Sequence, residues 1–544
     1  MTAAALDDLG RRVIQAVGMP KDAWEIAAQL EVIGMRDSDA RSGYGVRDLF
    51  ELARAIERRF RAGAYGFTLE GDDPRPHVIP ALRFVRRYLA GIAFALPMAM
   101  QAAAMLLWGY GIWGAIDLEL AQGSAIALGF IASYIAAGGF AQAIVRRGLF
   151  YIYQQEEGLA RWTALRGFGI AVRVTLALLL PALLVNLLFR ILPWPMVLTA
   201  SLFYAGLTVL WLSWALLYLV HRTELLVVIT ACALAAVLAA AKLGGASPIV
   251  ANAVGVIVAD VLSFSAAAYF LGRMARKRGN AQPVNPPRLA VLIFSTSRYF
   301  VYGVLFNAFL FADRFIAWTT SVGRDDFPPY AFWLNVRYEL AMDLALVVVI
   351  VMGGMIQYAI ERFSEKLVPH EKRTKSADRE TFAEEQLDGH RRRSRQLALT
   401  AVVALALAWL LLAALTTLSG EPGSQPGSQP ADSRSLQEAR FHEALTAPVT
   451  LRVFLAAAGA YTIFMFAVRN LLLLLTLSRV EAAVRSVAYA LLANVTVGFI
   501  CSRSIGYWAA VLGLVAGAIV MCIVAARETR RTIEELDYSY YAAY

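Results

Sequence analysis

The chain has few charged residues and very little cysteine. Only 17% of its 544 residues are Asp, Glu, Lys or Arg, against about 25% in an average soluble domain. Its three cysteines, Cys232, Cys501 and Cys522, lie in or beside apolar runs and form no CxxC pair. The five histidines are scattered, with no pair at i and i+4. These absences exclude a disulfide framework and give no support for a zinc site.

Motifs of enzymatic chemistry are also missing. The sequence contains no GxxxxGK[ST], no HExxH and no GxSxG, which are the signatures of P-loop NTPases, zinc proteases and α/β-hydrolases. Asp37-Ser38-Asp39 has the DxD spacing of sugar-nucleotide glycosyltransferases. No βαβ pattern surrounds it, so we interpret it as a turn or a helix cap. We expect a protein that is not an enzyme and that uses neither a cofactor nor a metal ion.

Long apolar runs take the place of these features. Hydrophobic residues make up 59% of the chain, and its mean hydropathy is +0.55. The runs contain about 20 or more residues, the length that crosses about 30 Å of hydrocarbon as a helix. The expected fold class is therefore all-α, a polytopic membrane protein. Because acidic Asp7 and Asp8 come at the start, we expect no signal peptide, and the first span should direct insertion.

The runs divide into two sets of six. We expect about twelve transmembrane helices, in two lobes at 88–271 and 289–526. A soluble helical region (1–80) precedes the lobes, a basic, Pro-rich linker (272–288) joins them, and a tail (527–544) follows. Two related halves are common in transporters, with the substrate path at their interface. The expected spans are 88–116, 119–145, 167–192, 196–220, 225–246, 248–271, 289–318, 338–360, 397–418, 449–476, 481–499 and 506–526.

Basic residues fall on alternate loops. If the N-terminus is cytoplasmic, the inner loops carry Arg146 and Arg147, the 273–288 cluster and the charged segment 361–396. The outer loops carry few basic residues, and the one at 419–448 is a spacer rich in Gly, Ser, Pro and Gln. This alternation predicts an inner-membrane protein with both termini in the cytoplasm. The net charge of +10 is then explained by loops that meet the lipid bilayer, and no nucleic-acid partner is expected.

Residues 1–80 are expected to form a small cytoplasmic helical region. Pro20, followed by Asp22, is typical of a helix start, and Leu49, Leu52 and Ile56 recur at helical spacing. This region and the 361–396 segment offer surfaces on which a cytoplasmic partner could dock.

Ionisable residues within the spans are the best site candidates, because a charge at membrane depth usually faces protein or water. Asp260 lies near the middle of the sixth span and is the candidate for loading a coupling ion, either H⁺ or Na⁺. Arg298, Arg173 and Arg469 lie toward the inner ends of their spans. Their guanidinium groups could bind an anionic or polyhydroxylated sugar. The alternative is that they snorkel to the headgroups.

A second group of charges lies at the outer ends of the seventh and eighth spans. Asp313 and Arg314 come near the end of one span, and Glu339 and Asp343 begin the next. The two carboxylates of the eighth span have a simpler interpretation as interfacial partners of Arg314 or Arg337.

The seventh span also carries a recognisable pattern. Residues 299–307, Tyr-Phe-Val-Tyr-Gly-Val-Leu-Phe-Asn, are followed by 313–318, Asp-Arg-Phe-Ile-Ala-Trp. This resembles the PelG-type membrane component of the Pel exopolysaccharide transporter. That family belongs to the multidrug/oligosaccharidyl-lipid/polysaccharide (MOP) exporter superfamily, with its MATE- and Wzx-like members. Glu361-Arg362-Phe363, Asn494 and Leu536-Asp537-Tyr538 are also similar, although Arg362 stands where a small polar residue is expected.

The resemblance implies a twelve-helix, two-lobed bundle that exports polysaccharide by alternating access, beside a cytoplasmic glycosyltransferase. Asn307, Asp313 and Asn494 are then expected to line or gate the path. Independently of the resemblance, an aromatic residue that faces the cavity, such as Tyr299 or Tyr302, could stack against a sugar. The leading hypothesis is a flippase or exporter of polysaccharide or lipid-linked oligosaccharide that hydrolyses no ATP. Basic side chains outnumber acidic ones toward the inner leaflet, which indicates an anionic cargo.

Three other functions stay open at this point. A cation or drug antiporter of the same architecture would be favoured by a deep acidic pair facing one cavity. A membrane-embedded glycosyltransferase or polymerase would need catalytic carboxylates on an outer loop, and Arg324-Asp325-Asp326 is the only candidate. A scaffold would recruit a synthase through residues 1–80 and 361–396.

Overall fold

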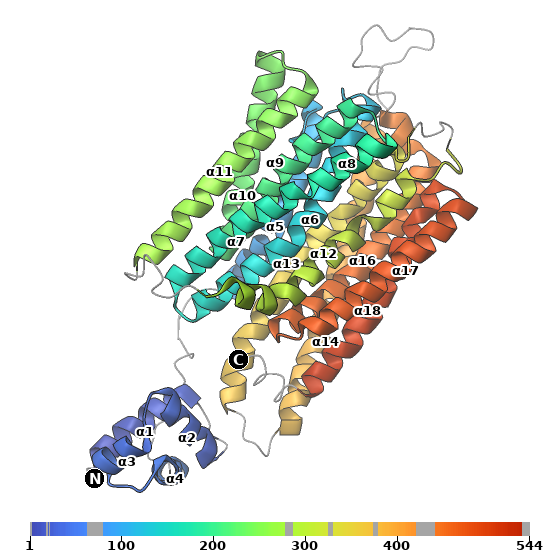
Figure 1. Ribbon diagram of the computed structural model, residues 1–544. Coiled ribbons are helices and arrows are strands. Elements are labelled where there is room, and N and C mark those ends of the chain that lie inside the picture. Colours follow the sequence, from blue (N-terminus) through green and yellow to red (C-terminus); the bar gives the residue numbers. More distant parts are fainter. Residues whose placement is uncertain are drawn as a thin grey trace, which may run out of the picture. The chain divides into compact units, whose positions relative to one another are not determined.

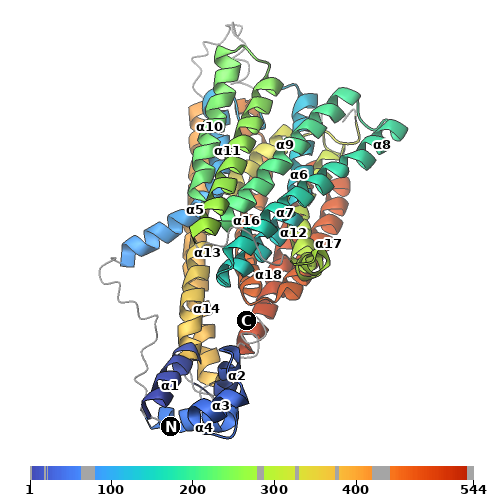
Figure 2. The same ribbon diagram turned by 60° about the vertical axis from the view of Figure 1, so that its left-hand side comes forward.

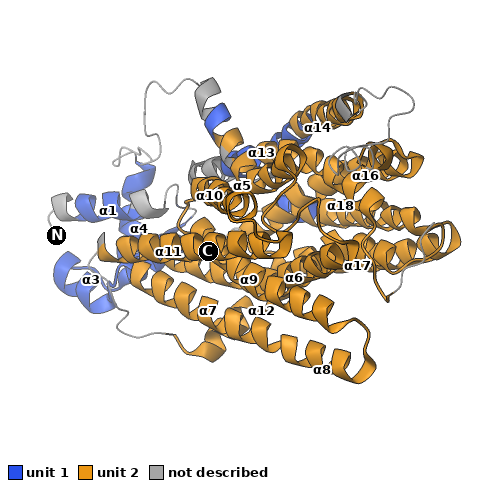
Figure 3. Cartoon of the chain, turned by 90° about the horizontal axis from the view of Figure 1, so that it is seen from above, with its two compact units in different colours: residues 1–86, 358–395, 530–544 blue, residues 87–357, 396–529 orange. Residues whose placement is uncertain are grey.

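The computed structural model describes residues 3–17, 20, 22–62, 80–277, 287–324, 330–373, 379–419 and 441–535. Within these ranges every regular element is a helix, apart from one isolated bridge between Tyr110 and Ala115. Figure 3 colours the two compact units of the chain. Unit 1 contains residues 1–86, 358–395 and 530–544, and unit 2 contains residues 87–357 and 396–529.

Several segments singled out in the sequence lie outside the described residues. They are the Pro-rich part of the linker (278–286), most of the Gly/Ser/Pro/Gln spacer (420–440), the outer-loop carboxylates at 325–326 and the pattern at 536–538.

Short helices form the N-terminal part of unit 1. They are α1 (Ala3–Val17), α2 (Ala23–Val32), α3 (Asp37–Tyr44) and α4 (Leu49–Arg61). α2 begins where the sequence predicts, because the Asp22 side chain accepts hydrogen bonds from the backbone N–H groups of Trp24 and Glu25. The apolar spacing of α4 is confirmed as well, since Leu52 and Ile56 are fully buried in the core of these helices.

The helices of unit 2 run beside one another as a bundle (Figures 1 and 2). Eleven helices of the described residues are long and apolar enough to cross a membrane, and α5 makes a twelfth if its two bent parts count as one span. The expectation of about twelve spans in an all-helical chain is therefore confirmed. The helix bounds are α5 (Pro80–Trp108), α6 (Leu120–Tyr153), α7 (Glu157–Ala177), α8 (Leu179–Phe189), α9 (Trp194–Leu219), α10 (Glu224–Leu238), α11 (Pro248–Lys277), α12 (Leu289–Trp318), α13 (Val336–Arg373), α14 (Arg379–Ser419), α16 (Pro448–Thr476), α17 (Val480–Ser504) and α18 (Val511–Glu534).

Prolines explain two interruptions that the expected spans did not include. α5 bends by 61° between Ala93 and Ala95, just before Pro97. The expected third span, 167–192, is divided into α7 and α8 at Leu178, just before Pro181. Proline has no N–H to donate to the carbonyl four residues earlier, and its ring clashes with that carbonyl, so the helix bends or breaks one turn upstream.

The expected first span, 88–116, extends too far. α5 ends at Trp108, and Gly109 has a left-handed backbone with φ of 78°. Its N–H donates to the carbonyl oxygen of Met105 at 3.0 Å, which closes the helix. Residues 109–118 are mostly apolar, but the glycines at 109, 111 and 114 end the helix. In the loop that follows, the Ile112 N–H donates to the Gln101 side chain at 2.7 Å.

The expected inner loop at 361–396 is mostly helix. α13 continues to Arg373, and α14 begins at Arg379. Hydropathy marks where a span leaves the membrane, but it does not mark where a helix ends. Lys, Arg, Glu and Gln are good helix formers, so both helices extend beyond their apolar parts.

In unit 2, the first two transmembrane helices of each half contact the first two of the other half. α6 packs against α7 and α9 in the first half, and α12 packs against α17 in the second. Between the halves, α6 packs along α12, and α5 approaches α13, where the Tyr88 hydroxyl donates to the carbonyl oxygen of Val351 at 2.9 Å. The second helix thus meets the seventh, and the first meets the eighth. Two equivalent six-helix halves around a pseudo-two-fold axis would produce this pairing.

Candidate functional site

The contact between α6 and α12, which we call the central seam, is formed by backbone against backbone. A Cβ added to Gly303 on α12 would lie 2.4 Å from the carbonyl oxygen of Gly138 on α6. One turn further along α12, Asn307 donates from Nδ2 to the carbonyl oxygen of Tyr134 at 2.8 Å. The structure therefore places Asn307, a candidate from the sequence, between the two halves.

The contact between α5 and α13, the second seam, has the same character. A Cβ on Gly91 would lie 2.8 Å from the Cα of Gly354, and a Cβ on Gly354 would lie 2.8 Å from the carbonyl oxygen of Tyr88. Small residues let helices approach this closely within a membrane. These glycines bring the backbones of the paired helices into direct contact at both seams.

Aromatic rings gather at the central seam. The Tyr134 ring of α6 lies 5.1 Å from Trp211 on α9 and 5.6 Å from Phe311 on α12, measured between centroids. Phe130 adds further contacts with Trp211 and Phe311. Sequence reasoning missed this cluster because its members come from three helices. Tyr302, the predicted sugar-stacking residue, is instead only 4% exposed and stacks on Phe306.

A cluster of charges, the Arg314 cluster, lies between α12 and α13, and all of its members except Asp343 are largely buried. Arg314 bonds Glu339, and its Nη2 lies 3.1 Å from Oδ1 of Asp343. The expected pairing of these two carboxylates with Arg314 is confirmed. Arg337 was the other expected partner, and it pairs instead with Glu443 at 3.1 Å.

Asp313 adds a third carboxylate to the Arg314 cluster. It is fully buried, and its Oδ2 accepts from the Tyr338 hydroxyl at 2.7 Å. Its Oδ1 has no hydrogen-bond partner within the described residues. Glu339 also accepts from the indole N–H of Trp318 at 2.8 Å. Asp313 is thus buried beside an ion pair that already has two carboxylates, and its Oδ1 offers a place for a proton.

Asp260 forms a separate acidic position in the first half. Its Oδ1 is buried and finds no hydrogen-bond partner among the residues that the structure describes. α11 presents this side chain toward α9, where a Cβ on Gly206 would lie 3.8 Å from Asp260 Oδ2. A carboxylate held in protein without a cation or a donor is costly to keep charged. This is the environment expected of a group that takes up an ion.

The helix ends that the sequence predicts to face the cytoplasm carry arginines with partners. Arg298, a sequence candidate, forms an ion pair with Glu481 of α17 at 2.6 Å, and both side chains are largely exposed. Arg146 of α6 donates from Nη2 to the Ser478 hydroxyl at 2.6 Å. Its guanidinium also lies 5.1 Å from the centre of the Tyr299 ring. Because Ser478 belongs to the turn between α16 and α17, this inner link joins the two halves, and sequence reasoning did not find it.

The remaining candidates lie away from the central seam. Arg173 is exposed, and its Nε donates to the carbonyl oxygen of Gly169 in its own helix. Arg469 is 4% exposed and donates to the Asn470 side chain at 3.2 Å. Asn494 is fully buried and donates to the carbonyl oxygen of Phe309 at 3.1 Å, which ties α17 to α12. Their roles in a path stay predictions.

The DxD spacing in the N-terminal helices has a structural explanation. Asp39 accepts from the Arg36 N–H and Asp37 from the Leu49 N–H, each at 2.9 Å. These bonds confirm the interpretation as helix and turn caps. Across the described residues, no three His, Cys, Asp or Glu side chains gather in a way that could hold a metal ion.

Solved structures with the same fold are MATE transporters. An inward-facing multidrug resistance MATE family transporter of the MOP superfamily aligns over 82% of this chain and 99% of its own, with a TM-score of 0.54 and 13% identity. A variant of the Vibrio cholerae MATE transporter VcmN aligns over 85% and 98%, with a TM-score of 0.54 and 12% identity. A MATE structure in the straight conformation aligns over 84% and 97%, with a TM-score of 0.52 and 14% identity. No protein-family model matches the sequence, and the search of curated proteins finds no match. The chain therefore has a MATE-like transporter fold.

Proposed function

We propose that this chain is a secondary membrane transporter that exports an anionic polysaccharide or a lipid-linked oligosaccharide by alternating access. The observation that carries the proposal is the pair of glycine-packed seams, α6 with α12 and α5 with α13. Two helical halves in backbone contact can rock against each other as rigid bodies. No ATP hydrolysis is needed, because cargo and coupling ion need only bind the inward and outward states differently.

Contacts at both ends of α6 support this cycle. At the inner end, the inner link joins Arg146 to Ser478. Toward the other end, the Ser124 hydroxyl accepts from the backbone N–H of Leu334, just before α13, at 3.1 Å. Aromatic residues of the same segment pack against a small apolar cluster formed by Ala125, Leu192 and Met196. An inward-open state requires the first contact to break, and an outward-open state requires the second to break.

The coupling ion has two possible sites in this proposal. Asp260 offers an unpartnered carboxylate oxygen in the first half, and Asp313 offers another in the Arg314 cluster of the second half. A proton or Na⁺ that binds either site offsets the penalty of a buried charge. If the ion binds one conformation more tightly, its gradient drives the cycle.

The basic inner side favours a negatively charged cargo. Arg146, Arg147, Arg161 and Arg166 lie at or between the expected inner ends of α6 and α7. Positive potential on this side raises the local concentration of an anionic polymer made in the cytoplasm. A cytoplasmic glycosyltransferase that delivers the polymer is part of the proposal.

A cation or drug antiporter is the second candidate. The excess of carboxylates in the Arg314 cluster favours it, because buried carboxylates attract cations. The solved structure with the same fold described as a multidrug resistance transporter fits this candidate equally well.

Deletion of the gene in its host separates the two candidates. Secreted and intracellular polysaccharide are measured by sugar analysis, and resistance to cationic drugs is measured in the same strains. Loss of secretion, with intracellular accumulation that the intact gene reverses, supports export of polysaccharide. Normal secretion with higher drug sensitivity supports the antiporter. No change in either measurement contradicts both.

A further inference from the structure

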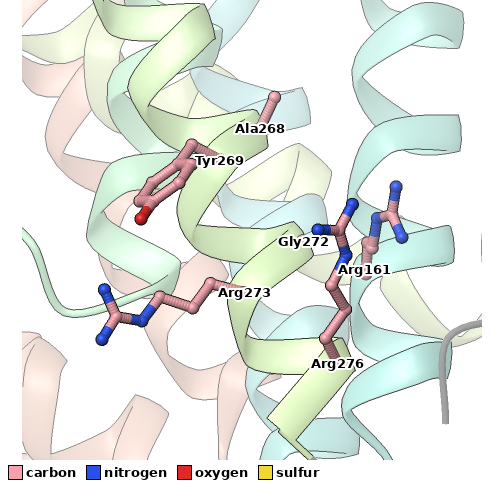
Figure 4. A pocket seen from close by; sticks show the side chains of 6 residues that line it. All are labelled: Arg161, Ala268, Tyr269, Gly272, Arg273 and Arg276. Carbon is pink, nitrogen blue, oxygen red and sulfur yellow. The ribbon is translucent and has the colours of Figure 1, made fainter. Parts of the chain in front are cut away.

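A pocket of about 490 Å³ lies between α7 and α11, close to the C-terminal end of α11. Figure 4 shows the side chains that line it. Arg161 comes from α7, and Tyr269, Arg273 and Arg276 come from α11, together with Ala268 and Gly272. No acidic side chain lines the pocket. It is distinct from both seams and from the Arg314 cluster.

Among the described residues, the three arginines of the pocket have no carboxylate partner. Ion pairs hold other arginines of the bundle, such as Arg298 and Arg485, but none joins Arg161, Arg273 or Arg276 to an acid within the described residues. Arg273 and Arg276 are three positions apart on one helix, and like charges at that spacing repel each other. In Figure 4 the guanidinium groups of Arg161 and Arg276 lie beside each other, whereas Arg273 extends to the other side of α11, next to Tyr269. A bound anion would relieve this repulsion.

The shape of the pocket leaves room for that anion. A Cβ built on Gly272 meets no heavy atom within 4 Å. Further along α11, away from its C-terminal end, the Phe264 ring stacks on Phe168 of α7 at 4.9 Å between centroids. The site therefore has a basic end at the helix termini and an apolar surface toward the middle of the span. A headgroup with an acyl chain has the same order of polar and apolar parts.

We propose that this pocket binds the phosphate of an anionic membrane lipid, with the guanidinium groups of Arg161 and Arg276 on the phosphate and the acyl chain along the Phe168–Phe264 pair. Arginine suits this ligand, because its planar group donates paired hydrogen bonds to phosphate oxygens. Basic pockets between transmembrane helices at the cytoplasmic surface are known to bind such headgroups. The inference does not depend on the cargo, and it concerns regulation or stability of the transporter by its bilayer.

Native mass spectrometry of the purified full chain tests the proposal. Phosphatidylglycerol, phosphatidylcholine and glycerol phosphate are titrated separately, and bound copies are counted. The expected result is tighter binding of phosphatidylglycerol than of phosphatidylcholine, by about tenfold. Glycerol phosphate alone should bind far more weakly than the lipid. If it binds as tightly as phosphatidylglycerol and displaces it, the site is one for a soluble phosphate and the lipid proposal is overturned.

Two kinds of variant locate the binding. Arg161→Gln with Arg276→Gln removes two charges from the pocket, and Gly272→Leu fills the space while keeping every charge. Both should lose the preference for phosphatidylglycerol, whereas Gly272→Ala should keep it. Arg166→Gln with Arg222→Gln is the matched control, because it removes two nearby charges that do not line the pocket. Equal losses in the control and pocket variants, or full binding by Gly272→Leu, would overturn the proposal. Should the double variant unfold, Gly272→Leu against Gly272→Ala still decides the matter.

Discussion

Asn307 on α12 donates a hydrogen bond from Nδ2 to the backbone carbonyl oxygen of Tyr134 on α6, at 2.8 Å. The bond lies one turn from the contact between Gly138 and Gly303. It joins the two halves where their backbones are closest, so any relative motion of α6 and α12 must strain or break it. We therefore assign Asn307 to the central seam between the two halves rather than to cargo binding.

The first prediction concerns the central seam. Gly303→Ala should destabilise the protein by about 1–3 kcal/mol and slow transport, because the new Cβ would meet the backbone carbonyl of Gly138 at 2.4 Å. Gly169→Ala is the control, since a Cβ there meets nothing within 4 Å. Thermal unfolding in detergent and export from cells measure the two effects. Equal melting temperatures for the two variants would show that the seam is looser than the structure indicates.

The second prediction concerns the Arg314 cluster. Arg314→Gln should destabilise the protein by about 3–5 kcal/mol, because it leaves buried carboxylates without their cation. Adding Glu339→Gln to this variant should recover much of the lost stability. Arg337→Gln removes a more exposed pair with Glu443 and should change stability by less than about 1 kcal/mol. The free energy of unfolding of the three variants is measured by chemical denaturation. If Arg314→Gln were as stable as Arg337→Gln, the carboxylates around Arg314 would not depend on it as their cation.

The third prediction concerns the inner link. Arg146→Ala removes the bond to Ser478, which holds the inner ends of the halves together, and should shift the population toward an inward-open state. A charge-assisted bond of about 1.5 kcal/mol would change that population ratio by about tenfold. Labelling of single cysteines introduced at the inner end of the central seam reports the shift. Arg485→Ala is the control, because its partner Glu528 lies in the same half. Unchanged labelling in Arg146→Ala would show that this link does not close the inner side.

The fourth prediction concerns Asp260. Asp260→Asn should raise the melting temperature or leave it unchanged, since it removes a charge that has no partner in the described residues. The same variant should lose cargo movement driven by an imposed proton or Na⁺ gradient in proteoliposomes. Glu224→Gln serves as the control, because Glu224 is exposed and pairs with Arg222. Normal gradient-driven transport by Asp260→Asn would remove Asp260 as a coupling residue and leave the Arg314 cluster as the remaining site.

Local patterns predicted most of the helices and two of the charge contacts. The pairing of Arg314 with Glu339 and Asp343 was expected because these carboxylates are only 25 and 29 positions away, at the facing ends of consecutive spans. The breaks at Pro97 and Pro181 were also visible in principle, since the rule for proline is local. Hydropathy does not mark either break, because both prolines stand within apolar runs.

Contacts between distant parts of the chain were not predictable in this way. The inner link joins residues 332 positions apart, and nothing near Arg146 distinguishes it from the other basic residues of its loop. Arg298 was expected to face a cavity, but its ion pair with Glu481 depends on how α12 and α17 pack. Its role toward a cargo stays a prediction.

The sequence by itself determined that this chain is a helical membrane protein with about twelve spans, because a membrane requires long apolar helices and each one is encoded by its own run of residues. Only the tertiary structure decided which helices form the two seams, and which charged groups have partners there. Those choices depend on how helix surfaces fit together across the bundle, and in a hydrocarbon environment that fit is set by small residues and single polar groups, which leave no periodic signal in the sequence.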